Sequence, residues 1–255
     1  MPKFSFSQIS QDQWFYRFSI SLFLLGQVMM RILRGKIHRG NVLEQMAIVG
    51  WGSLFAVLLI NSFTGVLFTV QMCRELEQLG ANSLVGGAFA LGYCRELTPI
   101  LVASLIVGEV SSAFAAEIGE MQVTEQLDAL YMLQTDPVNY LVVPRVVACC
   151  IMLPVLTMIA MSFGLVGGVL SGVQFYGLSA IDFLNDLRAT LAPADLLNIL
   201  LKSFVFGAIA AITGCGWGLT TTGGAKGVSK STKAAVVNGW LFVFAANFVL
   251  TLLLY

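Results

Sequence analysis

Two adjacent charges interrupt an otherwise apolar stretch of the chain. Arg95 and Glu96 stand inside the segment Gln78–Val110. A charge in the hydrocarbon of a bilayer costs at least about 2.5–3.5 kcal/mol, so it needs a partner or a water-filled cavity. Neighbouring residues on a helix point about 100° apart, so Arg95 and Glu96 cannot pair ideally with each other. Two interpretations stay open: an interhelical ion pair, or the polar wall of a substrate cavity. We favour the cavity.

The segment Gly108–Leu133 carries acidic residues in a helical pattern and contains no Lys or Arg. Its polar positions share one helical face, opposite an apolar face, and include Glu117, Glu120, Thr124 and Asp128. A helix that lies on an anionic membrane surface is normally basic. The pattern therefore favours a cytoplasmic helix that docks a protein, and a purely solvated helix is the alternative.

Few residues of this chain could carry out catalysis or bind a metal. His38 is the single histidine, and the five cysteines follow no metal-ligand or CxxC spacing. The loop Gly223–Ser231 resembles a phosphate-binding loop but lacks the Walker A spacing of glycine, lysine and serine or threonine. We expect no catalytic residue, metal site or cofactor in the chain. An intramembrane lipid- or peptide-modifying enzyme stays open as the alternative function, with these carboxylates as acid or base: Glu96, Glu109 and Glu117.

Composition excludes a water-soluble globule. The chain has 255 residues, of which 57% are apolar and 11% charged, whereas a soluble domain carries roughly 25% charged residues. Lys+Arg 14 balance Asp+Glu 14, so no net field attracts nucleic acid. Because lipid cannot satisfy loose backbone groups, we predict one all-α polytopic membrane domain.

Apolar stretches predict five transmembrane helices within residues 45–255. We expect them at about 46–73, 84–108, 145–173, 201–222 and 234–255, with the amphipathic cytoplasmic helix at about 113–133. Pro154 should kink the third span. With the N-terminus in the cytoplasm, the basic clusters Arg31–Arg39 and Lys226–Lys233 lie on the inside, as the positive-inside rule requires.

Residues 1–44 are expected to form a cytoplasmic and interfacial amphipathic segment. Only Phe18–Met30 is free of charge between Arg17 and Arg31, which is short for a span. The aromatic run Trp14–Tyr16 suits the headgroup level. A sixth span and a cleaved signal peptide are the alternatives.

Small residues recur every four positions in two of the expected spans. The third span carries Gly164, Gly168 and Gly172, and the fourth carries Ala210, Gly214 and Gly218. Such rows let helix backbones approach closely in lipid. We favour tight packing within one bundle, and a homodimer seam is the alternative.

The segment Gly108–Leu130, GEVSSAFAAEIGEMQVTEQLDAL, resembles the signature of the MlaE/YrbE permease family. Upstream, Arg95–Pro99 (RELTP) resembles the RELGP element of that family, and the likeness extends from about Leu43 to the C-terminus. Three positions depart from the family pattern. Glu109 stands where the family usually has Arg or a similar residue, and Ser111 and Thr98 each stand where it has Gly.

The resemblance implies the permease subunit of an ABC transporter that moves phospholipid between membranes. It implies an N-terminal interfacial helix, five spans, and two permease copies around a central lipid cavity. The implied partners are a cytosolic ABC ATPase dimer, which binds ATP and magnesium, and an MCE-domain protein on the outer side. The implied location is the bacterial inner membrane or the plastid inner envelope.

The resemblance also implies two groups of site residues. One group would form a coupling helix that sits in a groove of the ATPase: Glu117, Gly119, Glu120, Thr124, Glu125 and Asp128. The other would line the lipid cavity: Arg95, Glu96, Leu67, Val70, Gln71 and Arg74.

Overall fold

The computed structural model describes residues 24, 26–28, 30–31 and 39–255. Most of the expected N-terminal segment 1–44 lies outside these residues, as do the alternatives of a sixth span or a signal peptide. The described end of that segment is helical. The first long helix, α2, already begins at Arg39, so residues 39–44 belong to it.

Five helices of the described chain are long and apolar enough to cross a membrane, which confirms an all-α polytopic membrane protein. Each is longer than the span expected from charge-free residues, because the helical backbone continues past the apolar window into polar sequence. The five run over Gly40–Gln78, Val85–Val123, Val138–Tyr176, Pro193–Leu219 and Gly224–Leu254.

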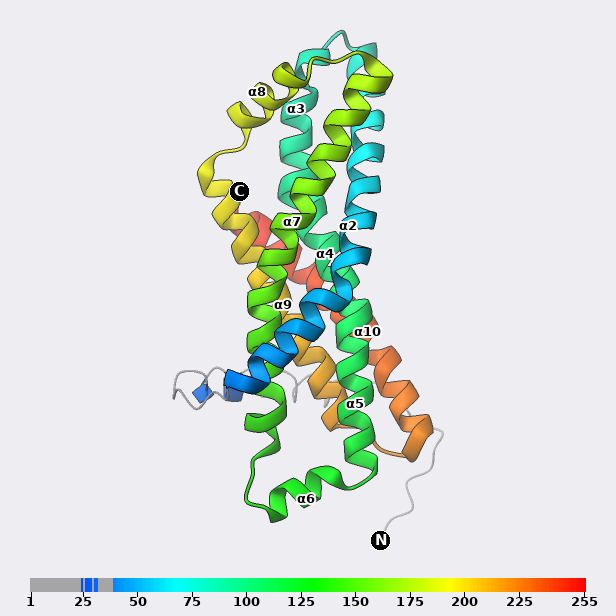
Figure 1. Cartoon of the computed structure of the whole chain (residues 1–255), viewed down its shortest axis with the longest axis vertical. Coiled ribbons are helices and arrows are strands. Elements are labelled where there is room, and N and C mark those ends of the chain that lie inside the picture. The colour runs from blue at the N-terminus through cyan, green and yellow to red at the C-terminus, as the bar shows by residue number, and fades with distance from the viewer. Residues whose placement is uncertain (1–23, 25, 29, 32–38) are drawn as a thin grey trace.

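Within residues 39–255 every regular element is a helix. The α-helices are α2 (Arg39–Gln78), α3 (Val85–Ala88), α4 (Thr98–Ile106), α5 (Ser112–Val123), α6 (Gln126–Met132), α7 (Val143–Tyr176), α8 (Ala180–Thr190), α9 (Pro193–Leu219) and α10 (Gly224–Leu254). A 3₁₀ turn covers Asn82–Leu84, and π-helical segments cover Phe89–Leu97, Val107–Ser111 and Val138–Val142. Figure 1 shows an elongated bundle with α6 at one end and α8 towards the other.

The rows of small residues pack inside this one chain. A Cβ built on Gly65 of α2 would clash with the carbonyl oxygen of Gly164 on α7. A Cβ on Gly214 of α9 would lie 2.8 Å from the carbonyl oxygen of Ser111, and one on Gly218 would meet Ile118. Close backbone approach within the bundle is therefore a role of these glycines, as favoured from the sequence, and the homodimer seam stays a prediction.

The second long helix, Val85–Val123, is continuous in direction but not uniform in winding. Pro99 cannot donate to the carbonyl of residue 95, and its ring crowds that carbonyl. The backbone N–H of Thr98 bonds instead to the carbonyl of Tyr93, five residues back, which closes a π-helical segment. Prolines thus shape this bundle without ending its helices, and α7 likewise passes through Pro154.

The expected amphipathic helix over 113–133 is wrong as a single element. Residues 112–123 continue the second long helix as α5, and the short helix α6 follows after a break at Thr124 and Glu125. The Thr124 hydroxyl donates to the carbonyl of Glu120, which competes with the helical backbone pattern. Glu125 adopts a left-handed conformation with φ 60°, so the chain turns sharply there.

The contact between α2 and α7 gives a direct test of the packing. We expect Gly65→Ala to lower the free energy of unfolding by about 1–3 kcal/mol, the usual cost of an overpacked core, because the new methyl group meets backbone atoms that cannot move aside. The measurement is thermal unfolding in detergent followed by circular dichroism. Gly108→Ala is the matched control, since nothing lies within 4 Å of a Cβ there. Equal melting temperatures for the two variants would contradict the close approach.

Candidate functional site

The Arg95–Glu96 pair lies in a network of charges that joins the second long helix to α9 and α10. An Arg95 Nη atom lies 2.6 Å from Oδ2 of Asp195, and Nζ of Lys202 lies 2.8 Å from Oε1 of Glu96. The Lys202 side chain is fully buried, and that of Asp195 is 7% exposed. Arg95 and Glu96 therefore form interhelical ion pairs, one of the two interpretations of the sequence. Their side chains turn to separate partners, as expected for neighbours on a helix.

Asp195 and Lys202 occupy one face of α9, seven residues apart, and thus meet both members of the pair. Asp195 lies in the first turn of α9, where its carboxylate also accepts the backbone N–H of Ala192 and is favoured by the helix dipole. Each partner is distant in sequence from the residue it meets, by 100 positions for Arg95 and 106 for Glu96.

The far end of α10 completes the network. The Thr251 hydroxyl lies within 3.2 Å of both Glu96 carboxylate oxygens and 2.8 Å from Nζ of Lys202. The amide nitrogen of Asn247 donates to Glu96 at 3.2 Å. The Tyr255 ring lies 4.9 Å from the guanidinium carbon of Arg95 and 5.0 Å from Nζ of Lys202. Three spans are thus tied together by one cluster of polar groups.

The four residues of α2 expected beside this pair lie elsewhere in the single chain. Leu67, Gln71 and Arg74 are exposed on one face of α2, Gln71 donates to Glu75, and the Val70 carbonyl accepts the Tyr176 hydroxyl. Within the part of the chain that the structure describes, the ion pairs and side-chain hydrogen bonds of Arg95 and Glu96 run to α9 and α10. A cavity shared by all six residues stays a prediction.

The opposite end of the bundle presents an exposed acidic and apolar surface, which we call the α6 surface. It combines acidic side chains before and within α6 with large apolar side chains at the end of that helix. The acidic members are Glu120, Glu125 and Asp128. The apolar members are Tyr131, Met132 and Leu133, which are 59%, 87% and 74% exposed. Exposed apolar side chains next to polar ones mark interaction sites in proteins.

Three further residues of the expected coupling group have different surroundings. A Cβ on Gly119 would lie 2.9 Å from the Thr221 hydroxyl, so Gly119 is buried against the loop between α9 and α10 and does not belong to the α6 surface. Glu117 pairs with Arg145 of α7 at 2.7 Å. Thr124 is exposed and forms the end of α5.

The Glu117–Arg145 pair fixes α5 to the base of α7. The Arg145 side chain is only 3% exposed, and its guanidinium carbon lies 5.2 Å from the Phe114 ring, a cation–π distance. One of its Nη atoms also donates to the carbonyl of Leu141. A displacement of the α6 surface would therefore reach two long helices together.

Sequence reasoning missed Asp195, Lys202 and Arg145 as members of these sites. A signal was present, because Asp195 and Lys202 are opposite charges spaced to share one helix face in the fourth span. Their two charges complement those of Arg95 and Glu96 in the second span. For Tyr131–Leu133, nothing in the sequence distinguishes exposed apolar side chains from buried ones.

The buried Lys202–Glu96 contact makes a quantitative prediction. Removing one partner of a buried pair leaves the other charge uncompensated and costs about 3–5 kcal/mol. We expect Lys202→Met to lower the free energy of unfolding by that amount and the Glu96→Gln/Lys202→Met double variant to recover part of it. The measurement is reversible denaturation in mixed micelles.

The exposed Lys230→Met variant is the control and should change the free energy of unfolding by less than about 0.5 kcal/mol. Strictly additive effects of Glu96→Gln and Lys202→Met would show that the two residues do not interact.

Comparisons with known proteins agree with this architecture. The model of the family described as Permease MlaE matches residues 42–253. A probable ABC transporter permease protein of Synechocystis is 50% identical over 98% of this chain and 95% of its own length. The chloroplast protein TRIGALACTOSYLDIACYLGLYCEROL 1 of Arabidopsis thaliana is 42% identical over 96% of this chain and 70% of its own length. A probable ABC transporter permease protein of Porphyra purpurea is 38% identical over 90% of this chain and 88% of its own length.

The family and the relatives from Synechocystis and Porphyra purpurea are named as permeases, which are transport components and not enzymes, so the alternative of an intramembrane enzyme is not supported. A permease of an ABC transporter works with an ATPase, and such a partner is therefore implied. The matched region includes nearly all of the five spans, the charge network except Tyr255, and the α6 surface. This chain belongs to the MlaE permease family, as a membrane-spanning permease subunit.

Proposed function

We propose that this chain moves phospholipid between membranes as one of two identical permeases, driven by a cytosolic ATPase dimer. The observation that carries the proposal is the second long helix. Its 39 residues extend about 58 Å at 1.5 Å per residue. The Arg95–Glu96 network lies towards one end, and the α6 surface follows the other. One long helix thus connects a charged site with an exposed docking surface.

The docking surface suits an ATPase partner by its chemistry. The α6 surface offers carboxylates that can pair with Lys or Arg, and apolar side chains that a partner groove would bury. ATP and magnesium would bind to that partner, and this chain would contribute no nucleotide ligand. The α6 end would face the cytoplasm, because Arg145 and the exposed Lys226, Lys230 and Lys233 occur at the same end.

Two features support a lipid as the transported molecule. The name of the Arabidopsis relative contains that of a lipid, trigalactosyldiacylglycerol. The apolar windows of α2 and α10 are only 28% and 17% buried in the single chain, so both helices offer extended apolar faces to acyl chains or to a second copy. An MCE-domain protein would receive or deliver the lipid at the α8 end, in a bacterial inner membrane or a plastid inner envelope.

The ion pairs would hold the wall of the lipid cavity in its resting position. ATP binding and hydrolysis would move α5 and α6, and the second long helix would pass this motion to Arg95 and Glu96. Leu67, Val70, Gln71 and Arg74, exposed or half-exposed in one chain, would face the cavity in the assembled dimer.

Purification in mild detergent, with mass spectrometry of the bound proteins and lipids, tests the proposal as a whole. We expect an ATPase, an MCE-domain protein and phospholipid to accompany the chain. Purification without any ATPase, from cells that express the complete set of genes, would contradict it.

A charge reversal on the α6 surface tests the coupling role. We expect Asp128→Lys to abolish binding of the ATPase, because the exposed carboxylate becomes a cation that repels basic groups of the partner. Insertion into the membrane should not change. The measurement is co-purification of the ATPase, and Glu77→Lys, an exposed reversal near the opposite end of the bundle, is the matched control. Equal recovery of ATPase with both variants would count against the coupling surface.

A paired substitution tests whether Arg95 contacts lipid. Arg95→Gln and Asp195→Asn both break the same ion pair, but only the first removes the cation. We expect Arg95→Gln alone to lower the phospholipid bound per complex several-fold, by mass spectrometry of the extracted lipids. Equal losses in both variants would show that the effect is structural and would refute the lipid contact.

A further inference from the structure

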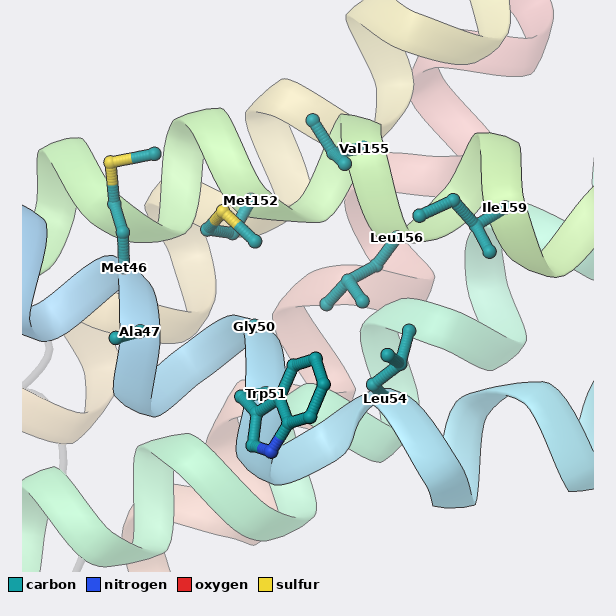
Figure 2. Close-up of a pocket in the computed structure, with 9 residues that line it drawn as sticks. All are labelled: Met46, Ala47, Gly50, Trp51, Leu54, Met152, Val155, Leu156 and Ile159. Carbon is teal, nitrogen blue, oxygen red and sulfur yellow. The ribbon is translucent and has the colours of Figure 1, made fainter.

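An apolar groove opens between α2 and α7, in the half of these helices nearer to α6. Its volume is 380 Å³, and the residues that line it are all apolar. Figure 2 shows side chains from both helices around it, with Met46, Trp51 and Leu54 on α2 and Met152, Leu156 and Ile159 on α7. The absence of a side chain at Gly50 makes room for the methyl group of Met152, which would clash with a Cβ there.

The position of the groove restricts what can fill it. Residues 46–54 and 152–159 belong to two of the helices that are long and apolar enough to cross a membrane, so we expect the groove to face hydrocarbon. An apolar cavity does not hold water without polar partners. The groove is also separate from the charge network. Gly92, three residues before Arg95, contacts Phe68, which lies further along α2 and nearer to its other end.

The size of the groove fits one flexible chain. A volume of 380 Å³ corresponds to about a dozen units the size of a water molecule or a methylene group. That is the scale of an acyl chain. Met46 and Met152 can adapt to an irregular occupant. Trp51, 82% exposed at the edge, offers an indole N–H to the ester region of a lipid.

We propose that this α2–α7 groove binds one acyl chain of a phospholipid as a resident lipid, in the leaflet on the α6 side. The bound chain would lie against Trp51, Leu54 and Val155 and would support the contact between α2 and α7. The proposal concerns a lipid held on the outer face of the bundle, and it stands whether or not this chain transports lipid.

Photo-crosslinking tests the proposal on the full chain in lipid nanodiscs. The probe is phosphatidylcholine with a diazirine in the middle of one acyl chain, and peptide mass spectrometry locates the adducts. We expect adducts to concentrate on groove residues such as Met152 and Val155. Val166 on the same helix is the internal reference, since it is 58% exposed against 44% for Val155 and does not line the groove.

Filling the groove provides the matched variant. We expect Val155→Trp to lower the adducts on the other groove residues about tenfold, the change that follows when roughly two methylene groups lose their buried contacts. Val166→Trp, the same substitution on the same helix, should leave them unchanged. Adducts in proportion to exposure along α7 would overturn the proposal. So would the absence of adducts in the groove, the result expected if residues 1–23 or a second copy cover it. The wild-type adduct map decides the matter even if Val155→Trp fails to fold.

Discussion

The pairing of the charges on the second long helix is the constraint on which this structure depends. Arg95 and Glu96 cannot remain unpaired in hydrocarbon, and the bundle supplies Asp195, Lys202 and Thr251 to meet them. This requirement fixes how α9 and the end of α10 sit against the second long helix. Ion pairs between packed helices are poor sources of stability, because desolvation offsets most of the attraction. Their value here is to define one arrangement of three spans.

Tight packing and charge pairing divide the bundle into two kinds of contact. Between α2 and α7, and between α9 and α5, glycines let the backbones approach within the width of a methyl group. Such contacts are rigid, because backbone atoms cannot rotate away. Around Glu96 the contacts come from side chains of three different spans, and polar side chains can exchange partners without a change of backbone. A moving permease needs both kinds, and the second long helix contains both.

The second long helix carries Arg95 and Glu96 of the charge network, and α6 follows directly after its end. This arrangement links coupling to transport in the proposed function. The π-helical turns near Arg95 and near Glu109 are places where the helix can change its winding locally. The Glu117–Arg145 pair adds a second connection, from α5 to α7. A displacement of α6 would therefore reach the spans by two routes. One is the backbone of the second long helix, and the other is the contact of Glu117 with Arg145.

The sequence by itself determined the membrane class, the five spans, the charged pair and the acidic segment, because composition and helical periodicity are local properties. Family membership also followed from a long local signature. The tertiary structure decided which residues meet: Asp195 and Lys202 follow the pair by 100 and 106 positions, and no periodicity encodes such a distance. It also divided the acidic segment at Glu125, where a left-handed residue outweighs helix-forming neighbours. It buried Gly119 because Thr221 lies against it. Pairing and burial depend on packing between segments that are distant in the sequence, and local patterns in the sequence do not reveal that packing.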